Sequence, residues 1–140
     1  MPELPEVETI ARQLREGREL REGRELREGR AEYSTVAPPP LVGRTILETH
    51  VLWAREVGPM TAAIFEERTR GCRVAAVGRH GKWLIIELAC ERGTERSYML
   101  VHLRMSGRLD VVPQADAYST HARVVWHLDE IWALRFDDAR

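Results

Sequence analysis

Hydrophobic residues change their spacing along this chain. In residues 3–14 they recur every three or four positions, which places them on one face of a helix. This stripe consists of Leu4, Val7, Ile10 (or Ala11) and Leu14. From Leu41 onward the hydrophobic residues alternate with polar ones or form short runs between glycines and polar clusters, as they do in β-strands. The pattern therefore predicts one N-terminal helix followed by a region of strands.

The strand region is expected to hold about eight short strands and a second, short helix. The strongest strand candidate is the run at residues 82–89, and residues 78–81 before it are expected to form a turn. The remaining strands are expected at residues 44–52, 72–77, 97–105, 108–112, 124–128 and 131–136, and the short helix at residues 61–68. The last two strands are separated by Asp129 and Glu130 rather than by Asn-Gly or Asp-Gly, which favours a loop longer than a tight hairpin turn. One helix followed by many short strands predicts a mainly β fold with flanking helices, namely a two-sheet β-sandwich with the N-terminal helix packed outside.

Residues 15–30 repeat a six-residue unit, REGREL. A six-residue period does not match the helical repeat, so successive leucines point to different sides, and each glycine weakens a helix by about 1 kcal/mol. The segment is expected to extend the helix as a solvated rod or to stay disordered, outside the core. A basic DNA-binding arm is a third alternative, although six arginines against five glutamates leave a charge of only +1. We interpret residues 1–140 as a single domain that contains residues 15–30 as a low-complexity insertion.

The overall charge of the chain is nearly zero. It has 140 residues, with 21 lysines and arginines against 22 aspartates and glutamates. Any binding of nucleic acid must therefore depend on local patches of charge. Cys72 and Cys90 lack the CxxC spacing of a zinc site and are expected to be free thiols. Without a long apolar run or a signal peptide, the chain is expected to be cytoplasmic and to have no membrane partner.

The first residues carry candidate chemistry. If Met1 is removed, Pro2 presents a secondary amine, and α-amino groups titrate near pKa ~8, so part of it is an unprotonated nucleophile at neutral pH. Such an amine forms a Schiff base with an aldehyde carbon. Glu3 and Glu6 lie close by and could hold the amine or move protons. The alternative is structural, because proline and acidic residues are favoured in the first turn of any helix.

The N-terminal string PELPEVET resembles the start of the formamidopyrimidine-DNA glycosylases, which remove oxidised purines from DNA. The resemblance implies that Pro2 attacks the sugar carbon of the damaged nucleotide, that Glu3 donates a proton and that Glu6 is a supporting acid. It also implies a two-sheet β-sandwich with a helix, in agreement with the strand pattern. The implied activity is that of a bifunctional enzyme, a DNA glycosylase and abasic-site lyase.

Two further segments resemble the same family. GRHGKWLIIEL is similar to its glycine- and arginine-rich turn, which implies an active-site role for Lys82, the only lysine in the chain. HLRMSGRL resembles the family's HLGMSG, which implies that Met105 fills the gap left by the flipped nucleotide; Arg104 stands where the family usually has glycine. The alternatives are a solvated charge at Lys82 and ordinary packing at Met105.

The last third of the chain completes the resemblance. His121 and Arg140 occupy positions comparable to those of family residues that contact DNA phosphates and the opposite strand. LRFDDAR is similar to the family's Arg-aromatic-x-Asp-Pro-Arg segment, with Ala139 where proline is usual. On their own, a loop histidine and an arginine at this position carry little information. The second histidine that the family has near His121 is replaced, with Arg123 in that area.

The resemblance covers only the N-terminal half of the family's proteins. Their helix–two-turn–helix domain and zinc finger have no counterpart here, so no metal site and no cofactor is expected. The expected partner is damaged double-stranded DNA, and the chain is expected to be a monomer. An alternative is an inactive truncated remnant, or a half-enzyme that needs a separately encoded C-terminal DNA-binding domain. A third is a protein-interaction module built on the charged repeat.

Overall fold

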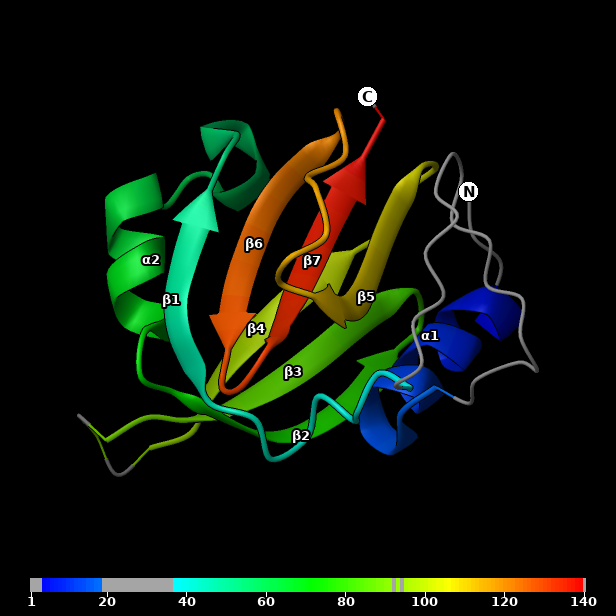
Figure 1. Ribbon diagram of the computed structural model, residues 1–140, viewed down its shortest axis with the longest axis horizontal. Coiled ribbons are helices and arrows are strands. Elements are labelled where there is room, and N and C mark those ends of the chain that lie inside the picture. The colour runs from blue at the N-terminus through cyan, green and yellow to red at the C-terminus, as the bar shows by residue number, and fades with distance from the viewer. Residues whose placement is uncertain (1–3, 19–36, 92, 94, 140) are drawn as a thin grey trace.

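The computed structural model describes residues 4–18, 37–91, 93 and 95–139, which form two antiparallel sheets flanked by helices (Figure 1). The elements are α1 (Leu4–Glu16), β1 (Ile46–Val51), the 3-10 helix η1 (Ala54–Val57), α2 (Ala62–Thr69), β2 (Arg73–His80), β3 (Trp83–Ala89), β4 (Ser97–His102), β5 (Gly107–Pro113), β6 (Ala122–Leu128) and β7 (Trp132–Asp138). One sheet has the strand order β1-β6-β7-β5 and the other β2-β3-β4. The expected two-sheet β-sandwich with an outer N-terminal helix is confirmed.

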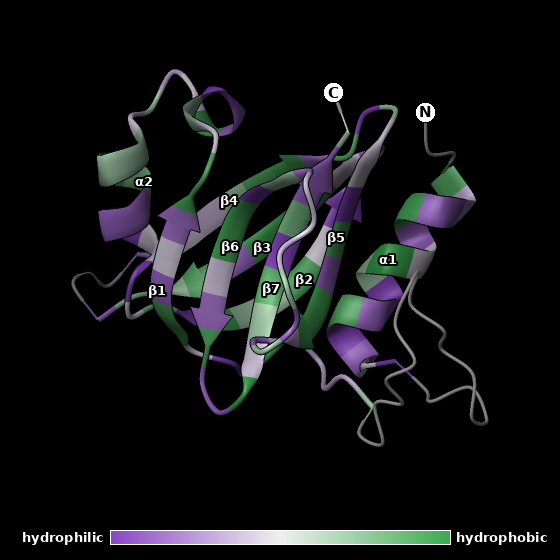
Figure 2. Ribbon diagram, turned by 45° about the horizontal axis from the view of Figure 1, so that its top comes forward, coloured by the Kyte–Doolittle hydropathy of each residue, from purple (hydrophilic) through white to green (hydrophobic). Residues whose placement is uncertain are grey.

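The core lies between the two sheets and follows the two-residue period of the strands. In β3 the buried side chains are Leu84, Ile86 and Leu88, while the residues between them are half-buried. Figure 2 shows hydrophobic and hydrophilic residues alternating along α1 and along strands such as β6. α1 lies beside β2 and β5, and α2 lies beside β1 at the opposite side of the sandwich (Figure 1). The helices thus close two sides of the core.

α1 buries the hydrophobic stripe that its sequence predicts. Val7, Ala11 and Leu14 are almost completely buried, whereas Leu4, at the start of the helix, is 44% exposed. The helix ends at Glu16, two residues later than expected, because Gly17 adopts a φ of +86° and donates its N–H to the carbonyl of Gln13 (2.8 Å). The first glycine of the repeat is therefore a helix terminator. The three alternatives for the rest of the repeat (a solvated rod, a disordered segment or a basic DNA-binding arm) concern residues 19–30, which lie outside the described residues.

Two strand ends differ from the expected ones by three residues, and the others differ by less. β2 continues through His80, so the expected turn at residues 78–81 is wrong, and only Gly81 and Lys82 separate β2 from β3. The glycine makes this tight connection with a φ of +59°. β4 ends at His102 rather than at residue 105, which leaves residues 103–106 as a connection to β5. The expected longer loop after β6 is confirmed, with three residues and a left-handed Glu130 at φ 62°.

The expectation of two free thiols is wrong, because Cys72 and Cys90 form a disulfide. The reason is the register of the hairpin. β2 and β3 pair with Arg73 opposite Ala89, so the residues just outside this pair are brought together, with their Cα atoms 4.3 Å apart. A separation of 18 residues in the sequence gives no sign of this proximity. None of the helices that the structure describes has both the length and the apolar character needed to cross a bilayer.

His127 gives the fold a pH dependence that can be tested. Burial lowers the pKa of His127 below the ordinary histidine value of 6.5, and the neighbouring His50, whose ring centroid is 5.0 Å away, lowers the pKa further. Below pH 6.5 the unfolded chain therefore binds a proton at this position before the folded chain does. We expect the free energy of unfolding to decrease as the pH falls from 6.5 through the lowered pKa.

The decrease in the free energy of unfolding at low pH should be smaller in a His127→Gln variant, because glutamine does not titrate. Urea unfolding of both proteins at pH 7.5 and 5.5 measures the difference. Asp137, whose pKa is raised mainly by burial, is present in both proteins, so its own pH dependence cancels in the comparison. An equal pH dependence in the two proteins would contradict the assignment to His127.

Candidate functional site

The segments that carry the predicted site residues lie on one side of the molecule. The start of α1, the connection between β4 and β5 and the end of β7 share this side in both ribbon views (Figures 1 and 2). Glu6 is exposed in the first turn of α1. Pro2, Glu3 and Arg140 lie outside the described residues, so their predicted roles stay predictions.

Ion pairs hold α1 against the hairpin that carries Lys82. The Glu8 carboxylate accepts hydrogen bonds from Arg79 Nε (2.5 Å) and from an Arg15 guanidinium nitrogen (3.0 Å), and these two bonds lower the pKa of Glu8. Arg79 also donates to the carbonyl oxygen of Gly81 at 3.2 Å. These bonds fix the position of α1 relative to the tight turn that carries Lys82. The Lys82 side chain is half-buried.

The turn at Lys82 is also linked to the connection that carries Met105. Trp83 and His102 are paired across β3 and β4, and their ring centroids are 4.8 Å apart in an edge-to-face arrangement. His102 Nδ1 accepts the backbone N–H of Arg104 at 3.0 Å. Lys82 and Met105 therefore extend from the ends of adjacent strands.

Met105 is 74% exposed, more than any other large hydrophobic side chain among the described residues. Ordinary packing of this methionine against the core is excluded by that exposure. It is also unlike the buried Met99 on the preceding strand, which is 6% exposed. A flexible apolar side chain presented to solvent in this way suits insertion into an apolar space of a partner.

Arg104 adopts a φ of 55°, in the left-handed region that favours glycine. This explains in physical terms why its position in the HLRMSG segment suits glycine. We expect Arg104→Gly to raise the free energy of unfolding by about 0.5–1 kcal/mol, since glycine has no Cβ to strain and keeps the N–H that bonds to His102. Urea denaturation measures the change.

Glu130 offers a matched control, because its φ of 62° is similar and it lies in the loop between β6 and β7. Glu130→Gly should stabilise the chain by a similar amount. A loss of stability in Arg104→Gly with a gain in Glu130→Gly would show that the arginine side chain contributes more than its backbone strain costs.

Asp138 joins three segments of the site. Its side chain is buried, and its Oδ1 accepts a hydrogen bond from Ser106 Oγ at 2.5 Å. Its backbone N–H donates to the carbonyl of His121 (2.9 Å), and its own carbonyl accepts from Arg123 Nε (3.0 Å). The residue after Met105, the segment that carries His121 and the start of β6 are thus all bonded to the last residue of β7. The His121 side chain itself is exposed.

Sequence reasoning missed Asp138, Ser106 and the pair formed by Glu8 and Arg79. For Asp138 a signal was present, because Leu134 and Phe136 point into the core and a two-residue period places position 138 on the same face. A carboxylate at a core-facing position calls for a specific partner. Positions 8 and 79, by contrast, are related only by the packing of α1 on β2.

The assembled site presents an exposed methionine together with arginine, lysine and histidine side chains. Arg104 is exposed beside Met105, Lys82 is half-buried on the adjacent strand end, and His121 is exposed on the segment bonded to Asp138. This arrangement suits contact with phosphates together with an apolar insertion. Among the described residues no group of three or more His, Cys, Asp or Glu side chains could hold a metal ion. The expected absence of a cofactor stays a prediction.

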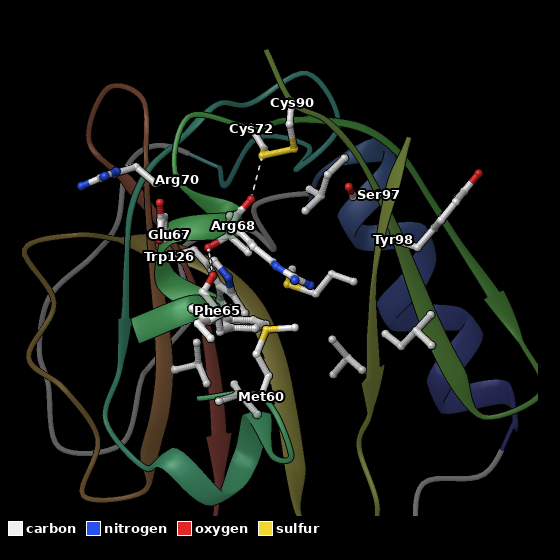
Figure 3. Close-up of a pocket in the computed structure, with 18 of the residues that line it drawn as sticks. Met60, Phe65, Glu67, Arg68, Arg70, Cys72, Cys90, Ser97, Tyr98 and Trp126 are labelled. Carbon is white, nitrogen blue, oxygen red and sulfur yellow. Dashed lines mark hydrogen bonds between the residues drawn. A yellow bond between two sulfur atoms is a disulfide. The ribbon is translucent and has the colours of Figure 1, made fainter. Parts of the chain in front are cut away.

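A groove of about 1220 Å³ lies between α2 and the edge strand β4 (Figure 3), and it reaches Trp83, His102 and Arg104 at the border of the candidate site. Its lining includes Met60 just before α2, Phe65 within α2, Trp126 from β6 and the disulfide between Cys72 and Cys90. None of the predicted site residues that the structure describes lines this groove. We therefore place the candidate site at the side of the molecule that carries Met105 and not in this groove.

Comparisons with a family model and with known sequences point to the same family. Residues 25–140 match the family model of the formamidopyrimidine-DNA glycosylase N-terminal domain. The chain is 36% identical over 141 residues to the formamidopyrimidine-DNA glycosylase of Chloroflexus aggregans and 29% identical over 140 residues to that of Protochlamydia amoebophila. Each alignment covers 100% of this chain and 41% of the relative, so the chain spans about two fifths of the length of these relatives.

Solved structures show the same fold. Lactococcus lactis Fpg in complex with DNA containing an oxidized pyrimidine matches with a TM-score of 0.73 at 22% identity, covering 99% of this chain and 41% of that one. The Lactococcus lactis Fpg complex with DNA containing an abasic site matches with a TM-score of 0.71 at 23% identity, covering 99% and 41%. At these identities the likeness concerns the fold alone.

Proposed function

Because the chain belongs to the formamidopyrimidine-DNA glycosylase family, we propose that it acts in base-excision repair as a DNA glycosylase that removes oxidised purines. The single observation that carries the proposal is the exposed Met105 on a connection fixed to the segment of His121. A base is reached for chemistry only after it leaves the helical stack, which costs a few kcal/mol. An apolar wedge that enters the vacated space offsets part of this cost.

The proposed reaction begins at the amine of Pro2 once Met1 has been removed. The nitrogen forms a bond to C1′ of the flipped nucleotide, the bond from C1′ to the base breaks, and the departing base takes a proton from Glu3. The proton of the Pro2 nitrogen then passes to the ring oxygen O4′ as the bond between C1′ and O4′ breaks, which leaves C1′ joined to Pro2 as a cationic Schiff base (an iminium ion). Glu6 supports the acid at this end of α1, where its side chain is exposed.

A lyase step follows from the Schiff base. Loss of a proton from C2′ and cleavage of the bond from C3′ to oxygen eliminate the 3′-phosphate, and hydrolysis then frees the amine. We assign Lys82 to these proton transfers and to the neighbouring phosphate, a role supported by its place in the turn that Arg79 holds next to α1. His121 and Arg140 are assigned to phosphates around the lesion.

The proposed partner is damaged double-stranded DNA, bound by a monomer that uses no cofactor within this chain. Since phosphate contacts dominate the affinity of proteins for DNA, the length of the relatives supports a second candidate. In that candidate the same residues act only together with a further DNA-binding domain. The two candidates differ in whether the folded chain alone releases a base.

Base release tests the first candidate directly. The folded chain is incubated at low salt with a duplex that contains one formamidopyrimidine or 8-oxoguanine, and the free base is quantified. We expect release by the unmodified chain, loss of release in Glu3→Gln and a decrease of about tenfold in Met105→Ala. Leu100→Ala is the matched control, because Leu100 is 58% exposed on β4 and has no assigned role.

Leu100→Ala should keep full activity. A folded chain that releases no base under these conditions would refute independent activity and favour the half-enzyme candidate. Equal losses in Met105→Ala and Leu100→Ala would refute the wedge role of Met105.

A further inference from the structure

The last residue of β7 presents a carboxylate where the strand alternation calls for an apolar side chain. Trp132, Leu134 and Phe136 are buried on the core side of β7, and Asp138 continues this row with only 1% of its surface exposed. Burying a carboxylate is costly unless hydrogen bonds compensate the lost water. An apolar side chain would pack against the core better than a carboxylate at this position. We therefore infer the role of Asp138 from the hydrogen bonds that it makes.

The bond from Ser106 Oγ to Asp138 Oδ1, at 2.5 Å, fixes one side of the Met105 connection. The other side is fixed by the backbone, because the N–H of Gly107 donates to the carbonyl of Leu103 at 2.8 Å. The exposed side chain of Met105 therefore projects from a short segment that is held at both ends. A wedge needs such a rigid base, since a mobile one loses entropy on insertion.

Asp138 is itself held in place from the other direction. Its carbonyl accepts a hydrogen bond from Arg123 Nε at 3.0 Å, and the Arg123 guanidinium lies over the ring of Trp53, 4.2 Å from its centroid. Its N–H bonds to the carbonyl of His121. A displacement of Asp138 would therefore reach both the Met105 connection and the segment of His121.

We propose that Ser106 and Asp138 form a positioning pair that holds Met105 ready for insertion at a lesion, an inference that rests on the proposed function. Neither residue needs to touch the reacting atoms. The pair selects for lesions, because a pre-positioned wedge favours duplexes in which a base is already missing or easily displaced. Removing the pair should weaken binding to a lesion and leave binding to undamaged duplex unchanged.

The test uses two readouts on the whole chain at low salt. The first is the ratio of affinities for a duplex with a tetrahydrofuran abasic analogue and for the undamaged duplex. The second is the fluorescence of 2-aminopurine placed opposite the analogue, which rises when an inserted side chain disturbs its stacking. Thermal melting confirms that each variant is folded. A substitution that acted only by destabilising the fold would lower the melting temperature and fail this control.

Ser106→Ala should lower the affinity ratio about fivefold and reduce the fluorescence change, and Ser106→Thr, which keeps a hydroxyl, should restore both. Asp138→Asn should weaken both readouts, whereas Asp137→Asn, on the neighbouring half-buried residue, should not. In a Met105→Ala background, Ser106→Ala should have no further effect, because the wedge that it positions is gone.

The possible failures are distinguishable. If Met105→Ala matches the unmodified chain in both readouts, the wedge role in the proposed function is wrong. If Met105→Ala weakens them while the folded Ser106→Ala and Asp138→Asn variants do not, the wedge stands and the positioning pair is refuted. Equal weakening by Asp137→Asn would also refute it, since that change leaves the bond to Ser106 intact.

Discussion

Arg135→Met is expected to lower the free energy of unfolding by about 3 kcal/mol. Arg135 is 5% exposed, and its guanidinium donates to the carbonyl oxygens of Gln114 (3.3 Å), Asp116 (2.7 Å) and Ala117 (3.2 Å). It also lies 4.8 Å from the centroid of the Tyr118 ring. Methionine fills a similar volume but leaves these carbonyls without their donor, at a cost of about 1–3 kcal/mol for each one that stays buried.

Urea unfolding measures this loss, with Arg108→Met on the neighbouring strand β5 as the matched control. The Arg108 side chain is 77% exposed, so its replacement should change the stability by less than about 0.5 kcal/mol. Arg135→Lys should give an intermediate loss, because lysine keeps the charge and loses the planar fork. Similar small effects of Arg135→Met and Arg108→Met would show that the hydrogen bonds from Arg135 to the three carbonyls do not stabilise the fold.

The same arginine bears on the site through the segment that it holds. Residues 114–121 cross the outer face of the four-stranded sheet in front of β7 (Figure 1), and this segment ends at His121. The bonds from Arg135 hold its first part, and the bond to Asp138 holds its last residue. The exposed His121 is thus presented from a segment that is fixed at two points.

Gly107→Ala is expected to cost about 2 kcal/mol. A Cβ built at Gly107 lies 2.9 Å from the Cα of Leu103 and overlaps with its carbonyl oxygen, so the backbone of the Met105 connection must move. Because the N–H of Gly107 bonds to that same carbonyl, the movement also weakens a hydrogen bond. Chemical denaturation gives the stability change.

Gly78→Ala on β2 is the matched control, because a Cβ at Gly78 meets nothing within 4 Å. Its effect should lie within about 0.5 kcal/mol of zero. Should Gly107→Ala prove as harmless as Gly78→Ala, the close approach of Leu103 does not determine the shape of the connection.

The sequence predicts best those elements whose hydrophobic period is undisturbed. α1 and β3 lie where the spacing of their apolar residues indicates, because each buries one regular face. The end of β2 was predicted wrongly as a turn, because Arg79 and His80 are flanked by glycines and have the composition of a turn. In the structure they extend the strand, and Arg79 bonds to α1 through Glu8.

The candidate site likewise combines residues that the sequence suggests with contacts that only the fold reveals. Family resemblance predicts roles for Met105 and His121, but their high exposure is visible only in the fold. The contacts that connect them, from Ser106 to Asp138 and from Asp138 to His121, join positions 32 and 17 residues apart, and no local pattern encodes such pairs. The disulfide between Cys72 and Cys90 was missed for the same reason, because hairpin register and not sequence spacing brings the two residues together.

The amine of Pro2 is proposed to form a Schiff base with damaged DNA. Borohydride reduction traps such an adduct as a stable covalent complex, so the measurement is trapping on a duplex that contains an abasic site, at low salt, with the folded chain. Its sequence makes the assignment sharp, since Lys82 is the only lysine and the two candidate amines are therefore Lys82 Nζ and the N-terminal nitrogen. Pro2→Gly, Glu3→Gln and Lys82→Ala are measured beside the unmodified chain.

We expect Met1 to be absent from the intact mass and the unmodified chain to give a covalent protein–DNA band. This band should weaken in Pro2→Gly and persist in Lys82→Ala. A folded chain that gives no band would contradict the claim. So would a band that is lost in Lys82→Ala and kept in Pro2→Gly, because the nucleophile would then be the lysine.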